Sequence, residues 1–369
     1  MRRRRGFITA FGTLTVGSFA GCLSSDSDTD TPTETAAGTE SETDTIVRQW
    51  SFETAGAVIS SPALVDGTVY AGSGDNTVYA INAANGTEQW AFQTNGGVSS
   101  SPAVVDGTVY VGSFDESVYA LDAGEGTEQW AFQTGNAVFS SPVVTDSTVF
   151  IGSNDGNVYA LDAEDGTEQW AFQTGNSVIS SPAVVDGTVY VGNGALGDDG
   201  TVYALDVGDG TEQWTFQTGP AVLSSPAVAD GMVFIGSEDG NVYALDAEDG
   251  TEQWTFQTGD SVRSLPAVVD ETVYVGSFDD NVYALDAGEG TEQWTFRTGD
   301  PVESSPRVVD GTVFVGSLDD NVYAIDVRDS TEKWTFQTDG GVACSPALAD
   351  TTVYVGSNDG NVYALTEGQ

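Results

Sequence analysis

Carboxylates are the main side chains in this sequence that could do chemistry. The chain has 56 acidic residues, two cysteines and no histidine. Without histidine it has neither an imidazole base nor a His-ligated metal, and two cysteines cannot build a disulfide framework or a multi-cysteine metal site. Carboxylate oxygens can bind calcium, and Asp198 and Asp199 are the candidates for a metal, in an insertion of residues 193–200. A loop without function explains the same insertion.

The other acidic and cysteine side chains have simpler explanations. Most Asp and Asn residues return in the same turn of a repeat, where Asp and Asn stabilise turns by bonding their own backbone. Cys344 stands where other copies have serine, and no base lies near it in sequence. We therefore predict that Cys344 is a small buried thiol and that the chain has no catalytic residue.

One stretch organises the sequence. Residues 120–130 read Ala-Leu-Asp-Ala-Gly-Glu-Gly-Thr-Glu-Gln-Trp, and close copies follow throughout the chain. The tryptophans of these copies lie 40 residues apart, except that 44 residues separate Trp170 from Trp214. A fixed period of this length indicates a solenoid, a propeller or an array.

A single repeat predicts four short strands. Asp106 and Gly107 form a hairpin signal, because glycine accepts a positive φ, and Gly124 and Gly126 mark another turn. Alternation along the last strand places Trp130 on one face and the glutamines on the other. The predicted strands are residues 98–106, 108–113, 118–122 and 127–134.

The middle strands of each repeat are apolar on both faces, so each sheet must be covered on both sides. Radial stacking of blades does this and leaves only short edges. One proline marks each repeat, eight in all: Pro62, Pro102, Pro142, Pro182, Pro226, Pro266, Pro306 and Pro346. We therefore predict an all-β, eight-bladed β-propeller of four-stranded antiparallel blades over residues 46–369.

The ring should close through the start of the chain. The last repeat offers only three strands, at residues 342–350, 352–357 and 361–365. Residues 46–52, Ile-Val-Arg-Gln-Trp-Ser-Phe, match the tryptophan strand of the other repeats. We predict that this N-terminal segment completes the eighth blade.

The unit Ala-x-Asp-x-x-x-Gly-x-x-x-Trp resembles the tryptophan-docking motif of pyrroloquinoline-quinone (PQQ) dehydrogenase propellers. The same repeat occurs in non-catalytic BamB-like propellers, which scaffold outer-membrane assembly. Here Asn82 departs from the motif's aspartate and Ser330 from its glycine. The resemblance implies a proline-containing innermost strand and an outermost tryptophan strand. It also implies docking between blades by Trp50, Trp90, Trp130, Trp170, Trp214, Trp254, Trp294 and Trp334.

The resemblance favours the non-catalytic branch. Enzymes of this family use an adjacent cysteine pair, a calcium site, a catalytic aspartate and long insertions around the quinone. This chain has no Cys-Cys pair, and seven of its eight repeats keep near-minimal length. We expect no cofactor, with a PQQ-dependent dehydrogenase holding PQQ and calcium as the alternative. A small-ligand or metal sensor that uses acids on the same face is a third hypothesis.

Function beyond a scaffold should lie where the repeats disagree. The residue before Ser-Ser-Pro varies most, and the resemblance implies that it rings the mouth of the central channel. One arc is apolar and the opposite arc is charged, which predicts a pocket or docking patch. An Arg–Glu pair that only fills a solvated funnel is the alternative. The predicted binding residues are Phe139, Ile179, Leu223, Arg263, Glu303 and Arg307.

The first 45 residues read as a leader and a tether. Residues 4–8, Arg-Arg-Gly-Phe-Ile, resemble a twin-arginine export motif, and residues 19–22, Phe-Ala-Gly-Cys, resemble a lipoprotein signal box. We expect residues 1–22 to be a signal peptide with lipidation at Cys22, although a chance cysteine would look the same. Residues 23–45 are polar and acidic and should form a disordered tether.

Charge excludes some partners. From Cys22 onward six bases face 56 acids, a formal charge of −50. Nucleic acid requires a basic surface, and anionic membrane surfaces are disfavoured for the same reason. At ~1 M salt the screening length falls to roughly 3 Å, which makes such self-repulsion tolerable and indicates a protein of a salt-loving organism. With its leader, the chain resembles a haloarchaeal-type lipoprotein. The sequence thus predicts an extracytoplasmic, membrane-anchored scaffold that binds a protein or peptide of the cell envelope.

Overall fold

The computed structural model describes residues 46–368, and every regular element within them is a β-strand. The signal peptide predicted for residues 1–22, the lipidation of Cys22 and the tether of residues 23–45 lie outside the described residues. No helix in the described part of the chain is long and apolar enough to cross a membrane.

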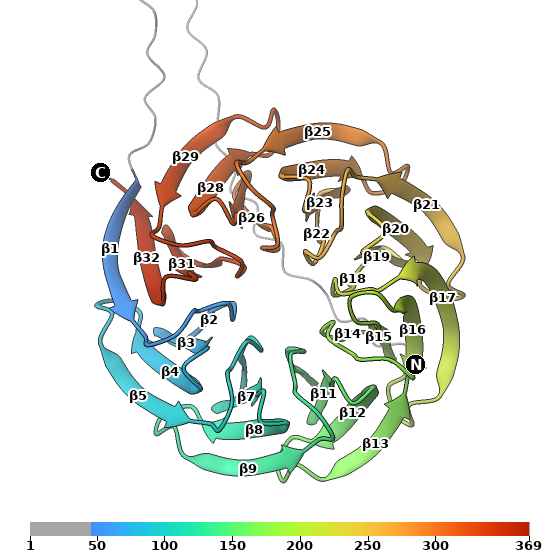
Figure 1. Cartoon of the computed structure of the whole chain (residues 1–369), viewed down its shortest axis with the longest axis horizontal. Helices are drawn as coiled ribbons and strands as arrows, with labels where there is room; N and C mark the ends of the chain where they lie inside the picture. The colour runs from blue at the N-terminus through green and yellow to red at the C-terminus, as the bar shows by residue number, and fades with distance from the viewer. Residues whose placement is uncertain (1–45, 369) are drawn as a thin grey trace, which may run out of the picture. The chain divides into compact units, whose positions relative to one another are not determined.

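The strands form eight four-stranded antiparallel sheets arranged around a central opening (Figure 1). The innermost strands are β2 (Ala63–Val65), β6 (Ala103–Val105), β10 (Val143–Thr145), β14 (Ala183–Val185), β18 (Ala227–Ala229), β22 (Ala267–Val269), β26 (Arg307–Val309) and β30 (Ala347–Ala349). The second strands are β3 (Thr68–Ser73), β7 (Thr108–Gly112), β11 (Thr148–Gly152), β15 (Thr188–Gly192), β19 (Met232–Gly236), β23 (Thr272–Gly276), β27 (Thr312–Gly316) and β31 (Thr352–Gly356). We number the blades one to eight in the order of these strands.

The third strands are β4 (Thr77–Asn82), β8 (Ser117–Asp122), β12 (Asn157–Asp162), β16 (Asp199–Asp206), β20 (Asn241–Asp246), β24 (Asn281–Asp286), β28 (Asn321–Asp326) and β32 (Asn361–Glu367). The outermost strands are β5 (Glu88–Gln93), β9 (Glu128–Gln133), β13 (Glu168–Gln173), β17 (Glu212–Pro220), β21 (Glu252–Gln257), β25 (Glu292–Arg297), β29 (Glu332–Gln337) and β1 (Ile46–Glu53). The predicted all-β, eight-bladed propeller is confirmed.

The predicted closure is also confirmed. β1 pairs antiparallel with β32, and Trp50 lies opposite Ala364. In the first blade Trp90 lies opposite Ala80 in the same way, so the N-terminal segment takes the place of an outermost strand. The two ends of the described chain therefore lie side by side in one sheet (Figure 1).

The innermost strands are shorter than the sequence predicted. Residues 98–106 were expected to form one strand, but β6 covers only Ala103–Val105. Proline has no N–H for a ladder, and the serines before it bond around the ring instead of along the sheet. The Ser61 N–H, for example, donates to the Ser101 Oγ of the next blade at 2.9 Å.

The tryptophans hold neighbouring blades together. Trp90 is buried, its ring lies 5.8 Å from that of Tyr70, and its indole N–H donates to the Ala123 carbonyl of the next blade at 2.9 Å. The indole N–H makes the equivalent bond in Trp50, Trp130, Trp170, Trp214, Trp254 and Trp294. Trp334 is the exception, because blade eight has no turn after β32 within the described residues, and its buried N–H has no partner there.

A glycine under six of the seven indoles that bond the next blade makes this packing possible. Gly126 has φ +68°, and a Cβ added to it would lie 2.5 Å from Cδ2 of Trp90. No side chain fits in that space. Ser330 takes the place of this glycine under Trp294, and Trp294 is correspondingly less buried than Trp254.

Trp50→Ala should destabilise the protein by about 3 kcal/mol, because it removes a blade-docking ring that closes the circle. The measurement is urea unfolding in high-salt buffer, followed by circular dichroism. Arg48→Ala, an exposed change on the same strand, is the control and should stay within about 0.5 kcal/mol of the parent. Equal effects of the two changes would contradict the closure.

Candidate functional site

Hydrogen bonds between loops define two faces of the ring. On one face, which we call the varied face, the loops that enter the inner strands meet the loops between the second and third strands. The Gly74 N–H donates to the Ala57 carbonyl there, and the Phe114 N–H donates to that of Gly97. On the opposite, constant face, the turn after the third strand meets the Asp-Gly hairpin turn, as where the Ala83 N–H donates to the Gly67 carbonyl.

The repeated aspartates of the varied face serve the fold. Asp115 accepts the Asn95 N–H of the inter-blade loop and the Tyr119 hydroxyl, both at 2.8 Å. Burial, reinforced by this hydrogen bond, raises the pKa of Tyr119 to about 12. The same Tyr–Asp bond joins Tyr79 to Asp75, Tyr159 to Asp155, Tyr243 to Asp239, Tyr283 to Asp279, Tyr323 to Asp319 and Tyr363 to Asp359. These carboxylates are therefore occupied by loop structure.

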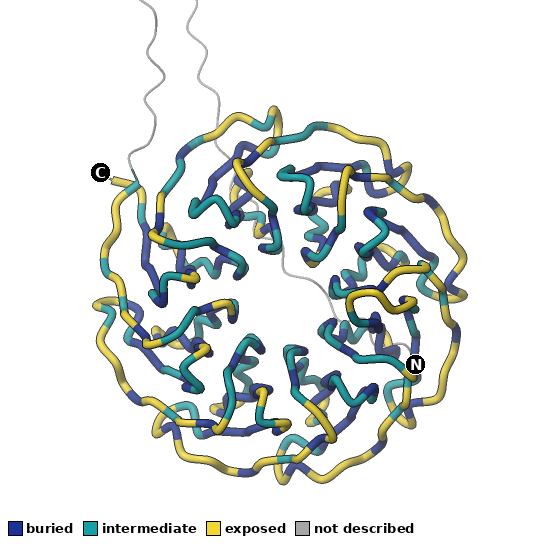
Figure 2. Tube along the Cα trace, viewed as in Figure 1, coloured by how far each residue is buried: buried dark blue, intermediate teal, exposed yellow. Residues whose placement is uncertain are grey.

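The insertion lengthens the hairpin of β16 and β17 and stands out as an exposed stretch beside β16 (Figure 2). Its Leu196 is 67% exposed, more than any other large apolar side chain within residues 46–368. Asp198 and Asp199 are exposed, and within residues 46–368 no three Cys, Asp or Glu side chains gather as metal ligands would. A calcium site at Asp198 and Asp199 remains a prediction without a supporting cluster.

Phe139 lies against an aromatic ring that the sequence analysis did not select. The rings of Phe139 and Phe114 are 4.2 Å apart, and Phe114 is 37% exposed. Phe114 occupies the position after Gly-Ser, which also differs between blades, although less than the position before Ser-Ser-Pro. The variation of this position between repeats is the sequence signal that could have identified Phe114. Ile179 and Leu223, also predicted, are half-buried at their positions before Ser-Ser-Pro.

Arg263 and Glu303 belong to one charged cluster. The Arg263 guanidinium donates to both carboxylate oxygens of Glu238, at 2.6 and 3.2 Å, and lies 4.2 Å above the ring of Phe278. Glu303 is largely buried beside them, and burial raises its pKa, although the positive charge of Arg263 opposes the shift. Glu238 is therefore bonded to Arg263 directly, whereas Glu303 is influenced by its charge without a direct ion pair. Glu238 and Phe278 both occupy the position after Gly-Ser.

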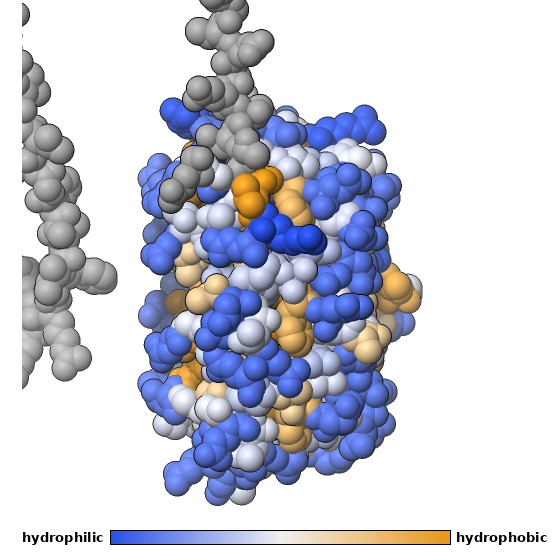
Figure 3. All heavy atoms as spheres, turned by 90° about the vertical axis from the view of Figure 1, so that its left-hand side faces the viewer, coloured by the Kyte–Doolittle hydropathy of each residue, from blue (hydrophilic) through white to orange (hydrophobic). Residues whose placement is uncertain are grey.

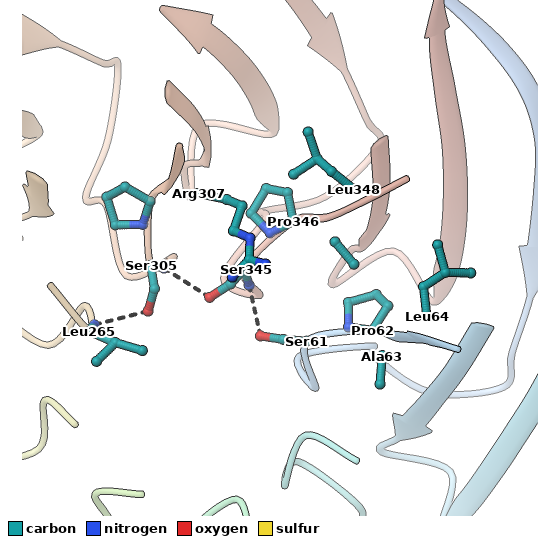
Figure 4. A pocket seen from close by; sticks show the side chains of 12 residues that line it. Ser61, Pro62, Ala63, Leu64, Leu265, Ser305, Arg307, Ser345, Pro346 and Leu348 are labelled. Atoms are coloured by element: carbon teal, nitrogen blue, oxygen red, sulfur yellow. Dashed lines mark hydrogen bonds between the residues drawn. The ribbon is translucent and has the colours of Figure 1, made fainter. Parts of the chain in front are cut away.

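Arg307 lies inside the channel. It lines a cavity of about 330 Å³ between blades six, seven, eight and one, with Ser305, Ser345, Ser61 and Leu265 (Figure 4). Its side chain extends toward Ser345 and Pro346 of the next blade (Figure 4). Arg307 is therefore separate from the cluster of Arg263 and Glu303.

A ring of backbone-to-hydroxyl bonds surrounds this channel. The N–H of the residue before each proline donates to the serine Oγ one blade further on, in seven bonds of 2.8–3.1 Å. The ring breaks at Leu265, which has no hydroxyl to accept a bond from Ser225. The sequence analysis did not select Leu265, because Pro266 follows it at the regular spacing and the repeat looks unbroken there.

Cys344 is a structural residue. It is fully buried, its Sγ accepts the Gly356 N–H at 3.0 Å, and burial raises the pKa of the thiol to about 12. Ser60 makes the same bond to Gly72 in blade one. A thiol that stays protonated is a poor nucleophile.

The family model described as "Outer membrane protein assembly factor BamB" matches residues 39–143, 132–227, 182–265 and 238–369. The fold is similar to that of BamB from Moraxella catarrhalis, with 19% identity, TM-score 0.75 and coverage of 87% of this chain and 100% of that one. The fold is also similar to that of the computationally designed Ika8 protein, with 19% identity, TM-score 0.78 and coverage of 86% of this chain and 99% of that one. A quinohemoprotein alcohol dehydrogenase from Comamonas testosteroni is similar with 16% identity, TM-score 0.74 and coverage of 87% of this chain and 76% of that one. No curated protein sequence matches the chain.

The channel residues do not fit PQQ with calcium. The resemblance implies that such a site would contain an adjacent cysteine pair and a calcium site of carboxylates and an amide. Cys344 has no cysteine neighbour, and the part of the chain that the structure describes holds no carboxylate group of three that could bind a metal. Glu238 and Glu303 are the carboxylates of the charged cluster that could be considered as metal ligands, but Glu238 is paired with Arg263 and Glu303 lies under the influence of the same positive charge. We derive no reaction step through a quinone.

Glu303→Gln should stabilise the protein at pH 7, because it removes a carboxylate whose ionisation burial disfavours. The pKa of Glu303 is raised in the folded state, so its ionisation costs stability above the folded pKa. That cost fades as the pH falls toward the unfolded pKa of about 4.3, and the gain of the variant should fade with it. The measurement is the free energy of unfolding of both proteins across this pH range.

Glu125→Gln, an exposed acid in a turn of the constant face, is the matched control for removing one negative charge. It should change stability much less at pH 7. A gain for Glu303→Gln no larger than for this control would contradict the assignment.

Proposed function

The chain belongs to the family described as outer membrane protein assembly factor BamB, and from that premise we propose that it is a non-catalytic scaffold of the cell envelope. It would stand outside the cytoplasm, held to the membrane by a lipid on Cys22, which lies outside the described residues. Its varied face would bind a protein or peptide partner.

The contrast between the two faces carries this proposal. The constant face repeats nearly the same turns in every blade, whereas the varied face differs at two positions in each blade. These positions place Ile59, Phe114 and Phe139 on one side of the mouth. Exposed apolar side chains grouped on one face are typical of protein interaction sites. The rim seen from the β1 and β32 side is mostly hydrophilic (Figure 3).

The charged cluster would give the face its specificity. Glu238, Arg263 and Glu303 carry a net charge of −1 when the carboxylates are ionised. A basic side chain of the partner would complement this cluster, and an acidic one would be repelled. The apolar residues would supply affinity, because aromatic anchors in packed positions carry most of the binding energy at interfaces.

The same proposal includes that the chain has no catalytic activity. The repeated carboxylates of the varied face bond loop N–H groups and tyrosine hydroxyls, and the buried Cys344 thiol bonds Gly356. The chain has no histidine to act as a base. These observations support a binding role rather than a catalytic one.

A photoreactive phenylalanine analogue at Phe139 should cross-link to a partner in intact cells kept in high salt. The same analogue at Ala84, exposed in a turn of the constant face, is the matched control and should cross-link far less. Phe114→Ala should reduce the yield at Phe139 by about tenfold, if the aromatic pair is an interface anchor. Equal labelling from both faces, or none from either, would contradict the proposal.

The alternative function is a PQQ-dependent dehydrogenase, since proteins of the same fold include a quinohemoprotein alcohol dehydrogenase. Titration of the purified protein with PQQ and calcium, followed by tryptophan fluorescence, distinguishes the two. We expect no saturable change and no reduction of an electron-accepting dye with alcohols. Saturable micromolar binding together with dye reduction would overturn the scaffold proposal.

A further inference from the structure

The largest departures from eightfold regularity in the inner ring lie in adjacent blades, whereas smaller ones occur elsewhere at Val143, Thr145 and Ala229. The residue after each proline is alanine in six blades, valine in one and Arg307 in blade seven. The following residue is valine in six blades and leucine at Leu64 and Leu348, and Leu265 replaces a serine of the hydrogen-bonded ring. Arg307 and all three leucines line the same 330 Å³ cavity. The one charged departure, Arg307, and the one loss of a ring serine, at Leu265, thus meet at the same cavity.

The polar groups at this cavity are donors. Arg307 forms no ion pair within residues 46–368, unlike Arg263, which is bonded to Glu238. The Oγ atoms of Ser305, Ser345 and Ser61 each accept a backbone N–H, as the dashed lines in Figure 4 mark. Their hydroxyl hydrogens make no bond to the described protein and are free to donate.

No acidic side chain lines this cavity. Within residues 46–368, Arg48 and Arg307 are the arginines without an ion pair, and of the two only Arg307 lines this cavity. A guanidinium binds a carboxylate with two parallel hydrogen bonds, and serine hydroxyls can complete the shell. A single guanidinium balances one negative charge, which disfavours a dianion such as phosphate.

We propose that this cavity binds a small monocarboxylate with a short alkyl chain. The carboxylate would lie between the Arg307 guanidinium and the ring of serine hydroxyls. The alkyl chain would lie on Leu265, the exposed leucine of the lining, beside the proline rings that precede the inner strands. Leu64 and Leu348 also line the cavity but pack against the cores of their blades. This site is distinct from the partner-binding face and does not depend on it.

The same chemistry has a second source, the terminal carboxylate of a peptide that ends in an apolar residue. A cavity of this volume is at the lower end of the range for small-molecule sites, so only the last residue of such a peptide could enter. Both sources require Arg307 and the apolar wall.

The probe is hexanoate, titrated into the full propeller by calorimetry in high-salt buffer, with hexylammonium and hexanol as ligands of matched length. We expect saturable binding of hexanoate alone. Arg307→Ala installs the residue of six other blades and should fold normally, yet it should weaken hexanoate binding at least tenfold. Circular dichroism checks the fold.

Leu265→Ser restores the eighth serine of the ring and removes part of the apolar wall. It should weaken hexanoate several-fold while leaving acetate, which has no alkyl chain to place, unchanged. Leu196→Ser, in the exposed insertion outside the cavity, is the matched control and should leave both affinities unchanged. No saturable hexanoate binding to the parent, equal binding of hexylammonium, or an unchanged affinity in Arg307→Ala would overturn the proposal.

A short peptide ending in leucine, with a free or an amidated terminus, distinguishes the two sources. Tighter binding of the free-ended peptide than of hexanoate, lost on amidation, would assign the site to chain ends. Weaker binding would assign it to free acids. Binding of the amidated peptide as tightly as the free one would count against carboxylate recognition altogether.

Discussion

The structure depends on one contact repeated around the ring, the indole of one blade held by the backbone of the next. Seven of the eight tryptophans donate their N–H to a carbonyl in a turn of the neighbouring blade, and in six of those turns a glycine leaves room for the ring. A sheet with apolar side chains on both faces cannot exist alone in water, so every blade needs two neighbours. Closure by β1 is therefore a requirement of the fold, because an open ring would expose two such faces.

Repetition also limits where function can lie. Most polar groups of a repeat are committed to it, as Asp115 is to Asn95 and Tyr119, and as Ser60 is to Gly72. A ligand could recruit these groups only by breaking the blade that contains them. What is left is the set of positions that can change without loss of the fold, and these lie in the loops of the varied face and along the channel.

The sequence predicted the architecture because period, turn chemistry and apolar pattern agree in eight copies. It also singled out the residues before Ser-Ser-Pro as candidates, since a column of aligned repeats shows variation directly, and their role in binding stays a prediction. It did not predict Phe114 or Glu238 as their partners, because those residues come from a different loop of the repeat and only folding brings the loops together. The short inner strands were missed because bonds between blades replace the ladder there.

Internal copies make this protein its own control for the role of a residue. Alanine is compatible with the fold after the proline, because six blades have it there, and serine is compatible at the place of Leu265 for the same reason. A side chain that the scaffold does not need, and that carries a charge into the channel, has no explanation in stability. The serine ring is broken at Leu265, one blade before Arg307 enters the same cavity. Two neighbouring departures, one that gives up a hydrogen bond and one that adds a charge, are better explained by a ligand than by packing.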